Sequence, residues 1–144
     1  MASPHLSGLE NFKDDLSDPE NVINQKKQFV IGVQGTSVTA GHDNRFNQSY
    51  PVVLGDLLKD PFAAAGVELI VRNHAMGWNP IYPSYLCVEE IIGKDADVAV
   101  WEFGMMGGST ADKETYLRTA LWLPNQPAVL FLDPGDRKST RLNS

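Results

Sequence analysis

Residues 29 to 41 read FVIGVQGTSVTAG and place a serine just after a short apolar run, where it could act as a nucleophile. An apolar run of this length that stops at glycine is typical of a buried strand. Ligands of open α/β sheets bind at the carboxyl ends of the strands, which makes Ser37 a candidate nucleophile. Serine is also common in turns and as a helix cap, so a purely structural role for Ser37 is the alternative.

Two further loops follow apolar runs. Residues 73–79 contain Asn73 and Gly77, and residues 104–110 contain three glycines and a serine. Glycine lets backbone approach a ligand closely and present its N–H groups, which is what an oxyanion hole requires. If the strands are parallel, all three loops lie at one edge of the sheet, and we expect the chemistry there.

The glycines of the first loop do not match the common nucleotide-binding patterns. Gly35 and Gly41 are one residue too far apart for a phosphate-binding P-loop, and no lysine follows Gly41. Gly32 and Gly35 do not form GxGxxG, and a GxSxG elbow would need glycine where Thr39 stands. A phosphate- or nucleotide-binding domain is therefore the least favoured interpretation.

Strand and helix patterns alternate after residue 28. The pattern predicts strands at 30–33, 67–72, 98–103 and 128–132, and helices at 49–59, 83–92 and 111–121. This alternation indicates an α/β fold with a parallel sheet and right-handed crossovers. In the first helix, Val53, Leu54, Leu57 and Leu58 are predicted to face the sheet, with Ser49 able to cap the helix.

The composition excludes several classes of protein. The chain has 144 residues, which suits one domain, and its net charge of -6 argues against a nucleic-acid-binding surface. Its one cysteine, Cys87, cannot form an internal disulfide or hold a metal ion alone, and we expect a buried thiol on a helix. No run reaches the roughly eighteen apolar residues of a membrane span. We expect no cofactor, and the compartment stays open.

The two ends of the chain differ from its middle. Residues 1–28 are polar and lack apolar periodicity, which predicts a mobile arm or linker. Residues 29–135 are expected to form a partial domain, without the fifth strand and closing helix that a doubly wound sheet normally adds. Residues 136–144 include the basic run RKSTRLNS, and we interpret them as a non-native tail after a truncated reading frame.

The three loops together resemble the motifs of the SGNH hydrolases, also called GDSL-like esterases and lipases. The first block of that family is G-D-S-x-[ST]-x-G after a strand, and residues 35–41 follow it with Thr36 in place of the aspartate. The second block is similar to residues 73–77. The third, a strand ending in an acid before G-x-N-D, is similar to residues 102–107. The resemblance covers residues 29–132.

The resemblance implies a flavodoxin-like three-layer sandwich and a serine esterase-type hydrolase. Its substrate would be an acyl ester of a sugar, a lipid or a small acid. Ser37 would attack the carbonyl carbon, and the backbone N–H groups of Ser37 and Gly77 would bind the developing oxyanion. The possible substrate-binding residues are Asn73, Asn79, Trp78 and Met106.

Two departures from the family pattern predict a crippled enzyme. Met106 stands where the family has its oxyanion asparagine, and a thioether donates no hydrogen bond. Losing one such donor lowers turnover by about 10²–10³-fold in a working hydrolase. The D-x-x-H block that supplies the general base is absent, since the last histidine is His74. His42 beside Asp43 is a poor replacement, because adjacent side chains rarely point at each other.

A non-catalytic relative that binds the same ligands is therefore the alternative to an esterase, with Trp78 and Met106 lining an apolar pocket. Glu102, at the end of a central strand, is expected to accept hydrogen bonds from loop amides. The expected partner is a small-molecule, sugar or lipid ester, and neither nucleic acid nor a membrane.

Overall fold

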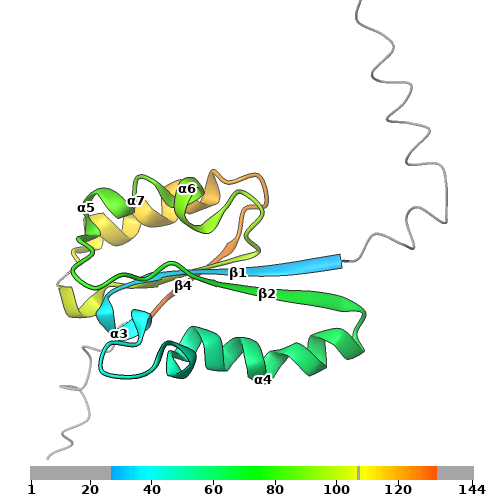
Figure 1. Cartoon of the computed structure of the whole chain (residues 1–144). Coiled ribbons are helices and arrows are strands. Elements are labelled where there is room, and N and C mark those ends of the chain that lie inside the picture. Colours follow the sequence, from blue (N-terminus) through cyan, green and yellow to red (C-terminus); the bar gives the residue numbers. More distant parts are fainter. Residues whose placement is uncertain (1–26, 107, 133–144) are drawn as a thin grey trace, which may run out of the picture.

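The computed structural model describes residues 27–106 and 108–132, and their strands form one sheet with all neighbours parallel (Figure 1). The strands are β1 (Lys27–Gly35), β2 (Val67–Asn73), β3 (Val98–Glu102) and β4 (Ala128–Phe131), in the order β2-β1-β3-β4. The predicted α/β fold with a parallel sheet is thus confirmed. β1 begins two residues before the expected start of the domain, and the rest of the predicted arm and the predicted tail lie outside the described residues.

Helices cover both faces of the sheet and complete three layers. Figure 1 shows α4 along one face and α5, α6 and α7 along the other, with the short α3 at the end of β1. The helices are α3 (Ser37–Ala40), α4 (Tyr50–Ala64), α5 (Ile81–Ser84), α6 (Val88–Ile92) and α7 (Thr110–Leu121), with 3-10 turns η1 (Phe46–Gln48) and η2 (Gly104–Met106). No helix in the described part of the chain is both long and apolar enough to cross a membrane.

The larger part of the core lies between β3 and the helices α6 and α7. Trp101 of β3 is fully buried and packs against the rings of Phe103 and Tyr116, with ring centres 5.4 and 6.3 Å away. Val88 and Ile92 of α6 complete this cluster. Aromatic burial of this size supplies much of the stability of a small domain, so β3 is held firmly on this side.

On the opposite face, α4 meets the sheet through a different set of residues from the predicted one. Leu54 packs on the sheet as predicted, but Val53 is 41% exposed and Leu57 is 70% exposed. The contacts come instead from Tyr50 and Phe62, whose ring lies 5.3 Å from that of Phe29. Because the helix turns about 100° per residue, the direction midway between Leu54 and Phe62 lies about 100° from Leu57 and about 140° from Val53, which leaves these two toward solvent.

Two predicted helix boundaries are wrong. The first helix continues past Lys59 to Ala64 although Pro61 cannot donate a backbone hydrogen bond, and the Phe29–Phe62 contact holds this last turn on the sheet. The predicted helix 83–92 is two short helices, α5 and α6, with residues 85–87 between them.

The predicted environment of Cys87 is also wrong. It is exposed and precedes α6 as its N-cap residue, instead of being a buried helical thiol. The apolar side of α6 is formed by its next residue, Val88, and by Ile92, both of which are fully buried. Since these two positions are four residues apart, the cysteine next to them falls outside the buried face.

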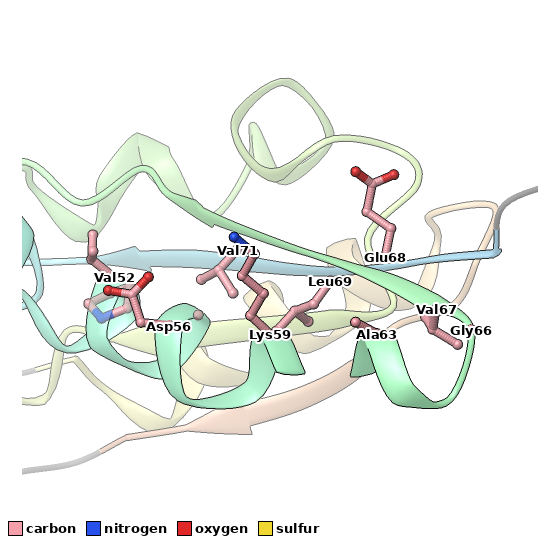
Figure 2. Close-up of a pocket in the computed structure, with 11 residues that line it drawn as sticks. Val52, Asp56, Lys59, Ala63, Gly66, Val67, Glu68, Leu69 and Val71 are labelled. Carbon is pink, nitrogen blue, oxygen red and sulfur yellow. The ribbon is translucent and has the colours of Figure 1, made fainter. Parts of the chain in front are cut away.

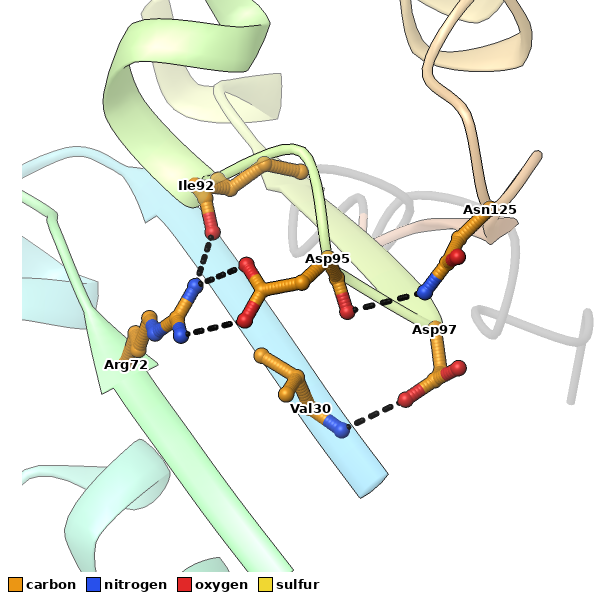
Figure 3. A network of polar contacts seen from close by, with 6 residues as sticks. All are labelled: Val30, Arg72, Ile92, Asp95, Asp97 and Asn125. Carbon is orange, nitrogen blue, oxygen red and sulfur yellow. Dashed lines mark hydrogen bonds and ion pairs between the residues drawn. The ribbon is translucent and has the colours of Figure 1, made fainter. Parts of the chain in front are cut away.

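Polar contacts fix the start of β3 against β1 and β2 (Figure 3). The backbone N–H of Val30 donates to Asp97 at 2.7 Å. Arg72 of β2 forms two hydrogen bonds with Asp95, at 2.7 and 2.8 Å, and a third with the Ile92 carbonyl oxygen. The bidentate bond from Arg72 is the main cause that lowers the pKa of the Asp95 carboxyl.

We expect Asp95→Asn to lower the free energy of unfolding by about 0.5–1 kcal/mol at neutral pH, the range for solvent-accessible ion pairs. Because folding lowers the pKa of Asp95, its contribution is complete above the ordinary aspartate pKa and is lost as pH falls through the lower folded value. Urea unfolding at neutral pH and near pH 3, below the ordinary pKa, measures both effects. A difference between the variants that is equally large near pH 3 would contradict the argument, and Glu89→Gln on the exposed side of α6 is the control.

Candidate active site

The candidate nucleophile lies at the end of β1, the second strand of the sheet. β1 ends at Gly35, and Ser37 is the first residue of α3. The residue that caps α3 is Thr36, whose side chain accepts a hydrogen bond from the Val38 N–H at 3.4 Å. None of the described residues forms a hydrogen bond with the Ser37 hydroxyl, which is half-buried. The alternative reading of Ser37 as the helix cap is therefore wrong.

The two glycines of this turn are required by its close packing. A Cβ on Gly35 would lie 2.5 Å from Thr39 Oγ1, a distance at which atoms collide. Gly41 has φ of 86°, in the left-handed region, and a Cβ there would lie 2.9 Å from the Ser49 Cβ. The spacing of the two glycines therefore reflects a compact turn that presents Ser37.

The carboxylate of Glu102 holds this turn through hydrogen bonds. It is the last residue of β3, is 3% exposed, and stands beside Gly35 in the parallel register of β1 and β3. Its Oε2 accepts hydrogen bonds from the Thr36 hydroxyl at 2.9 Å, the Thr39 hydroxyl at 2.8 Å and the Thr36 N–H at 3.3 Å. The expectation of hydrogen bonds from a loop amide is confirmed, and two hydroxyl groups add to it.

Tyr50 forms the wall of the same buried region. Burial raises the pKa of its phenol above the ordinary value, the neighbouring Thr39 side chain lowers it, and the charge of Glu102 raises it further. The phenol is therefore neutral over the pH range in which a hydrolase works. Its ring packs with Leu54 on the α4 side of the sheet.

The second loop lies against the Ser37 turn. A Cβ built on Gly77 would lie 3.8 Å from the Ser37 Cβ, which is van der Waals contact. The loop is attached to β1 by backbone hydrogen bonds, from the His74 N–H to Val33 at 2.9 Å and from the Met76 N–H to Gly35 at 3.4 Å. The Gly77 N–H donates to none of the described groups, so it is free to face a ligand.

Asn73, a predicted substrate-binding residue, uses its side chain to join loops. Its amide nitrogen donates to the Thr39 carbonyl oxygen at 3.1 Å and to Ser49 Oγ at 3.4 Å. Its Oδ1 accepts from the Ala75 N–H at 3.1 Å. Since these bonds occupy both ends of the amide, Asn73 positions the second loop relative to α3 and α4.

The third loop contributes different groups from those of the family pattern. Met106 ends η2 and is half exposed, and its N–H donates to the Phe103 carbonyl oxygen at 2.9 Å. Gly107 lies outside the described residues. Ser109 caps α7, since its hydroxyl accepts from the Asp112 N–H at 3.2 Å and donates to the Asp112 carboxylate.

Neither histidine of the described chain contacts the Ser37 hydroxyl. The side chains of His42 and Asp43 do point at each other, with Nδ1 and Oδ1 3.1 Å apart, contrary to the expectation for adjacent residues, but both are exposed. His74 is bonded to the sheet through its backbone instead of its ring. Burial and the positive charge of Arg72 lower its pKa, which favours the neutral imidazole.

Two hollows lie beside β2 and the loop that follows it, and the larger one is on the α4 side. It has a volume of about 730 Å³ and lies between α4 and β2, with Val71 and Leu69 pointing toward α4 (Figure 2). The second, of about 620 Å³, is lined by residues of the second loop and of α5 and α6, including Asn73 and Asn79. Ser37, Trp78 and Met106 line neither hollow.

Thr39 is a residue of the candidate site whose role the sequence did not predict. It is fully buried, and its hydroxyl joins Ser37's helix to Glu102. The sequence did contain a signal for it, because the motif that residues 35–41 resemble has serine or threonine at this position. Serine and threonine both combine a short side chain with a hydroxyl donor, and at this position the hydroxyl of Thr39 reaches the Glu102 carboxylate.

No family model and no curated protein matches this sequence. Among solved structures, it is similar to a two-domain esterase (CEX) active on acetylated mannans, co-crystallised with mannopentaose, at 19% identity and a TM-score of 0.61 over 85% of this chain and 33% of that one. A second structure of such an esterase gives 18% identity and a TM-score of 0.62 over 79% and 33%. The chain thus spans about a third of the length of these structures, and the likeness shows that it shares their α/β fold over that part.

We expect Glu102→Ala to lower the free energy of unfolding by about 2–4 kcal/mol, because the buried hydroxyl groups of Thr36 and Thr39 lose their acceptor. Glu102→Gln keeps an oxygen acceptor of the same reach, and it should lose less than half as much. Urea unfolding followed by circular dichroism measures both, with Asp60→Asn, an exposed position of α4, as the control. An alanine variant as stable as the original chain would show that Glu102 does not hold the turn.

We expect Gly41→Ala to be more destabilising than Gly66→Ala. Both glycines have positive φ, which costs about 1–2 kcal/mol for alanine. A Cβ on Gly66 meets nothing within 4 Å, whereas one on Gly41 also meets Ser49. The difference in melting temperature between the two variants isolates the packing of the Ser37 turn, and equal losses would contradict it.

Proposed function

We propose that this chain carries the nucleophile and the backbone oxyanion donors of a serine esterase-type hydrolase of the SGNH kind. The observation that carries the proposal is the Ser37 hydroxyl, which bonds to none of the described residues and lies beside Gly77 at the carboxyl end of β1. A serine with a purely structural role normally bonds to nearby backbone, and here Thr36 takes that role. A free hydroxyl beside free amides suits nucleophilic attack on an ester.

In the proposed reaction, the Ser37 Oγ forms a bond to the acyl carbon, and the alcohol leaves with a proton. Water then hydrolyses the acyl-enzyme and frees the serine. The tetrahedral oxyanion would accept hydrogen bonds from Gly77 and from Ser37 itself, whose N–H lies in the first turn of α3, where backbone donors have no intrahelical acceptor. Turnover also needs a general base, which the described residues do not supply.

An acyl ester of a saccharide is the proposed substrate class. Both similar solved structures are esterases active on acetylated mannans, and one was co-crystallised with mannopentaose. The groove beside the second loop has polar as well as apolar lining, which suits a sugar better than a lipid chain.

The proposal is tested with p-nitrophenyl acetate and acetylated manno-oligosaccharides. We expect this chain to release acetate slowly, above the buffer rate, because Ser37 attacks the ester without a general base to accept its proton. Ser37→Ala should fall to the buffer rate, while Val38→Ala, a change at the exposed neighbour, should keep the original rate. Equal rates for the original chain and Ser37→Ala would leave the esterase without its nucleophile.

A non-catalytic saccharide-binding relative is the second candidate function. It is favoured by Met106 at the oxyanion position and by the lack of a base in contact with Ser37 among the described residues. In that case both the original chain and Ser37→Ala would show the buffer rate, and both would still bind the oligosaccharide.

A further inference from the structure

Two large aromatic side chains are exposed in and just after the second loop. Trp78 directly follows Gly77 and is 95% exposed, and Tyr82, at the start of α5, is 66% exposed. An aromatic side chain has about 150–250 Å² of surface, and its removal from water is energetically favourable. The Trp78 ring contacts no other ring among the described residues, and the Tyr82 ring meets that of Tyr85, with ring centres 6.0 Å apart, so most of both surfaces stays open to a ligand.

The backbone presents Trp78 at the tip of a turn. Its φ of 60° lies in the left-handed region, where bulky residues are rare. The Asn79 N–H donates to the Met76 carbonyl oxygen at 3.3 Å and closes this turn. The chain therefore keeps a tryptophan at a position that glycine would fill with less strain, and it does so next to the candidate oxyanion donor.

The groove of about 620 Å³ adjoins this tip, because Met76 and Asn79 on either side of Trp78 both line it. Pro83, next to Tyr82, lines it as well. Its volume is within the range of small-ligand sites. None of the residues that line it is a lysine or arginine, so an anionic ligand would find no cationic partner there.

Apart from the Glu90 carboxylate, the polar groups of the groove include the neutral side chains of Asn79 and Ser84. Asn79 Oδ1 accepts from the Ser84 hydroxyl at 2.9 Å, and its amide nitrogen donates to none of the described groups. An amide N–H with no protein acceptor at the edge of a groove is available to a ligand oxygen.

We propose that Trp78 and Tyr82 form a stacking platform for the pyranose rings of a neutral saccharide, whose hydroxyl groups meet Asn79 in the adjoining groove. A pyranose ring has C–H groups on its faces and hydroxyl groups at its rim, so it fits an apolar aromatic surface beside neutral polar groups. A lipid chain would need a continuous apolar lining. The choice of ligand rests on the proposed function, but the binding itself does not require the nucleophile.

Isothermal titration of the full chain with mannopentaose, which carries no ester, tests this platform. We expect Trp78→Gly to raise the Kd at least tenfold and Tyr82→Ala to raise it by a smaller factor. Glycine tolerates the backbone of Trp78, so the melting temperature of Trp78→Gly should equal or exceed the original. Trp122→Ala is the matched control, because Trp122 is 90% exposed and ends α7, and it should leave the Kd unchanged.

An unchanged Kd in Trp78→Gly, an equal loss in Trp122→Ala, or no binding of mannopentaose by the original chain would each overturn the proposal. Binding of decanoate in place of the oligosaccharide would overturn it in favour of a lipid site. Ser37→Ala separates the two proposals, because it should bind mannopentaose with the original Kd. If Ser37→Ala keeps its esterase rate but Trp78→Gly loses the sugar, the esterase proposal fails and the platform stands.

Discussion

The hydrogen bonds of the buried Glu102 carboxyl group are the interaction on which the candidate site depends. β1 and β3 are adjacent and parallel, so Gly35 and Glu102 reach the same edge side by side. Glu102 is then within reach of the hydroxyl groups of Thr36 and Thr39, on either side of Ser37 in the chain. A buried carboxyl group must find donors, and the donors need an acceptor, so each fixes the other. The position of Glu102 in the sheet therefore determines the conformation of the Ser37 turn.

The polar groups around Ser37 fall into two sets with different roles. The Oε2 of Glu102 and the side chains of Thr39 and Asn73 bond to groups of the chain and hold the first and second loops together. The Ser37 hydroxyl and the Gly77 N–H have no such partners among the described residues. A binding or catalytic site needs both sets, because free groups act on a ligand only when their positions are fixed.

The sheet was predictable from the sequence because each strand is a short apolar run between breakers, and parallel pairing follows from the alternation with helices. The face of α4 was not, since Leu57 and Leu54 look equally apolar and only the Phe29–Phe62 contact chooses between them. Cys87 was misplaced because a break between two short helices leaves little trace in an apolar pattern. In the candidate site, motif spacing predicted Ser37 and Gly77, which the structure brings close together, whereas the hydrogen bond of Thr39 depends on the register that places Glu102 beside Gly35.

Thr36 stands where the SGNH motif, which residues 35–41 resemble, has an aspartate. A threonine hydroxyl donates to Glu102 and accepts from the Val38 N–H at once, whereas an ionised aspartate in its place could only accept. The threonine is thus matched to a carboxyl acceptor below it, and the turn keeps its shape without the aspartate. The other two departures, Met106 in place of the oxyanion asparagine and the missing D-x-x-H block, would affect the chemical step of the proposed reaction instead. The presentation of Ser37 depends on buried hydrogen bonds, and in the proposed hydrolase its activation would depend on a proton acceptor that these bonds do not involve. A chain of this fold can therefore retain the first property while the second changes.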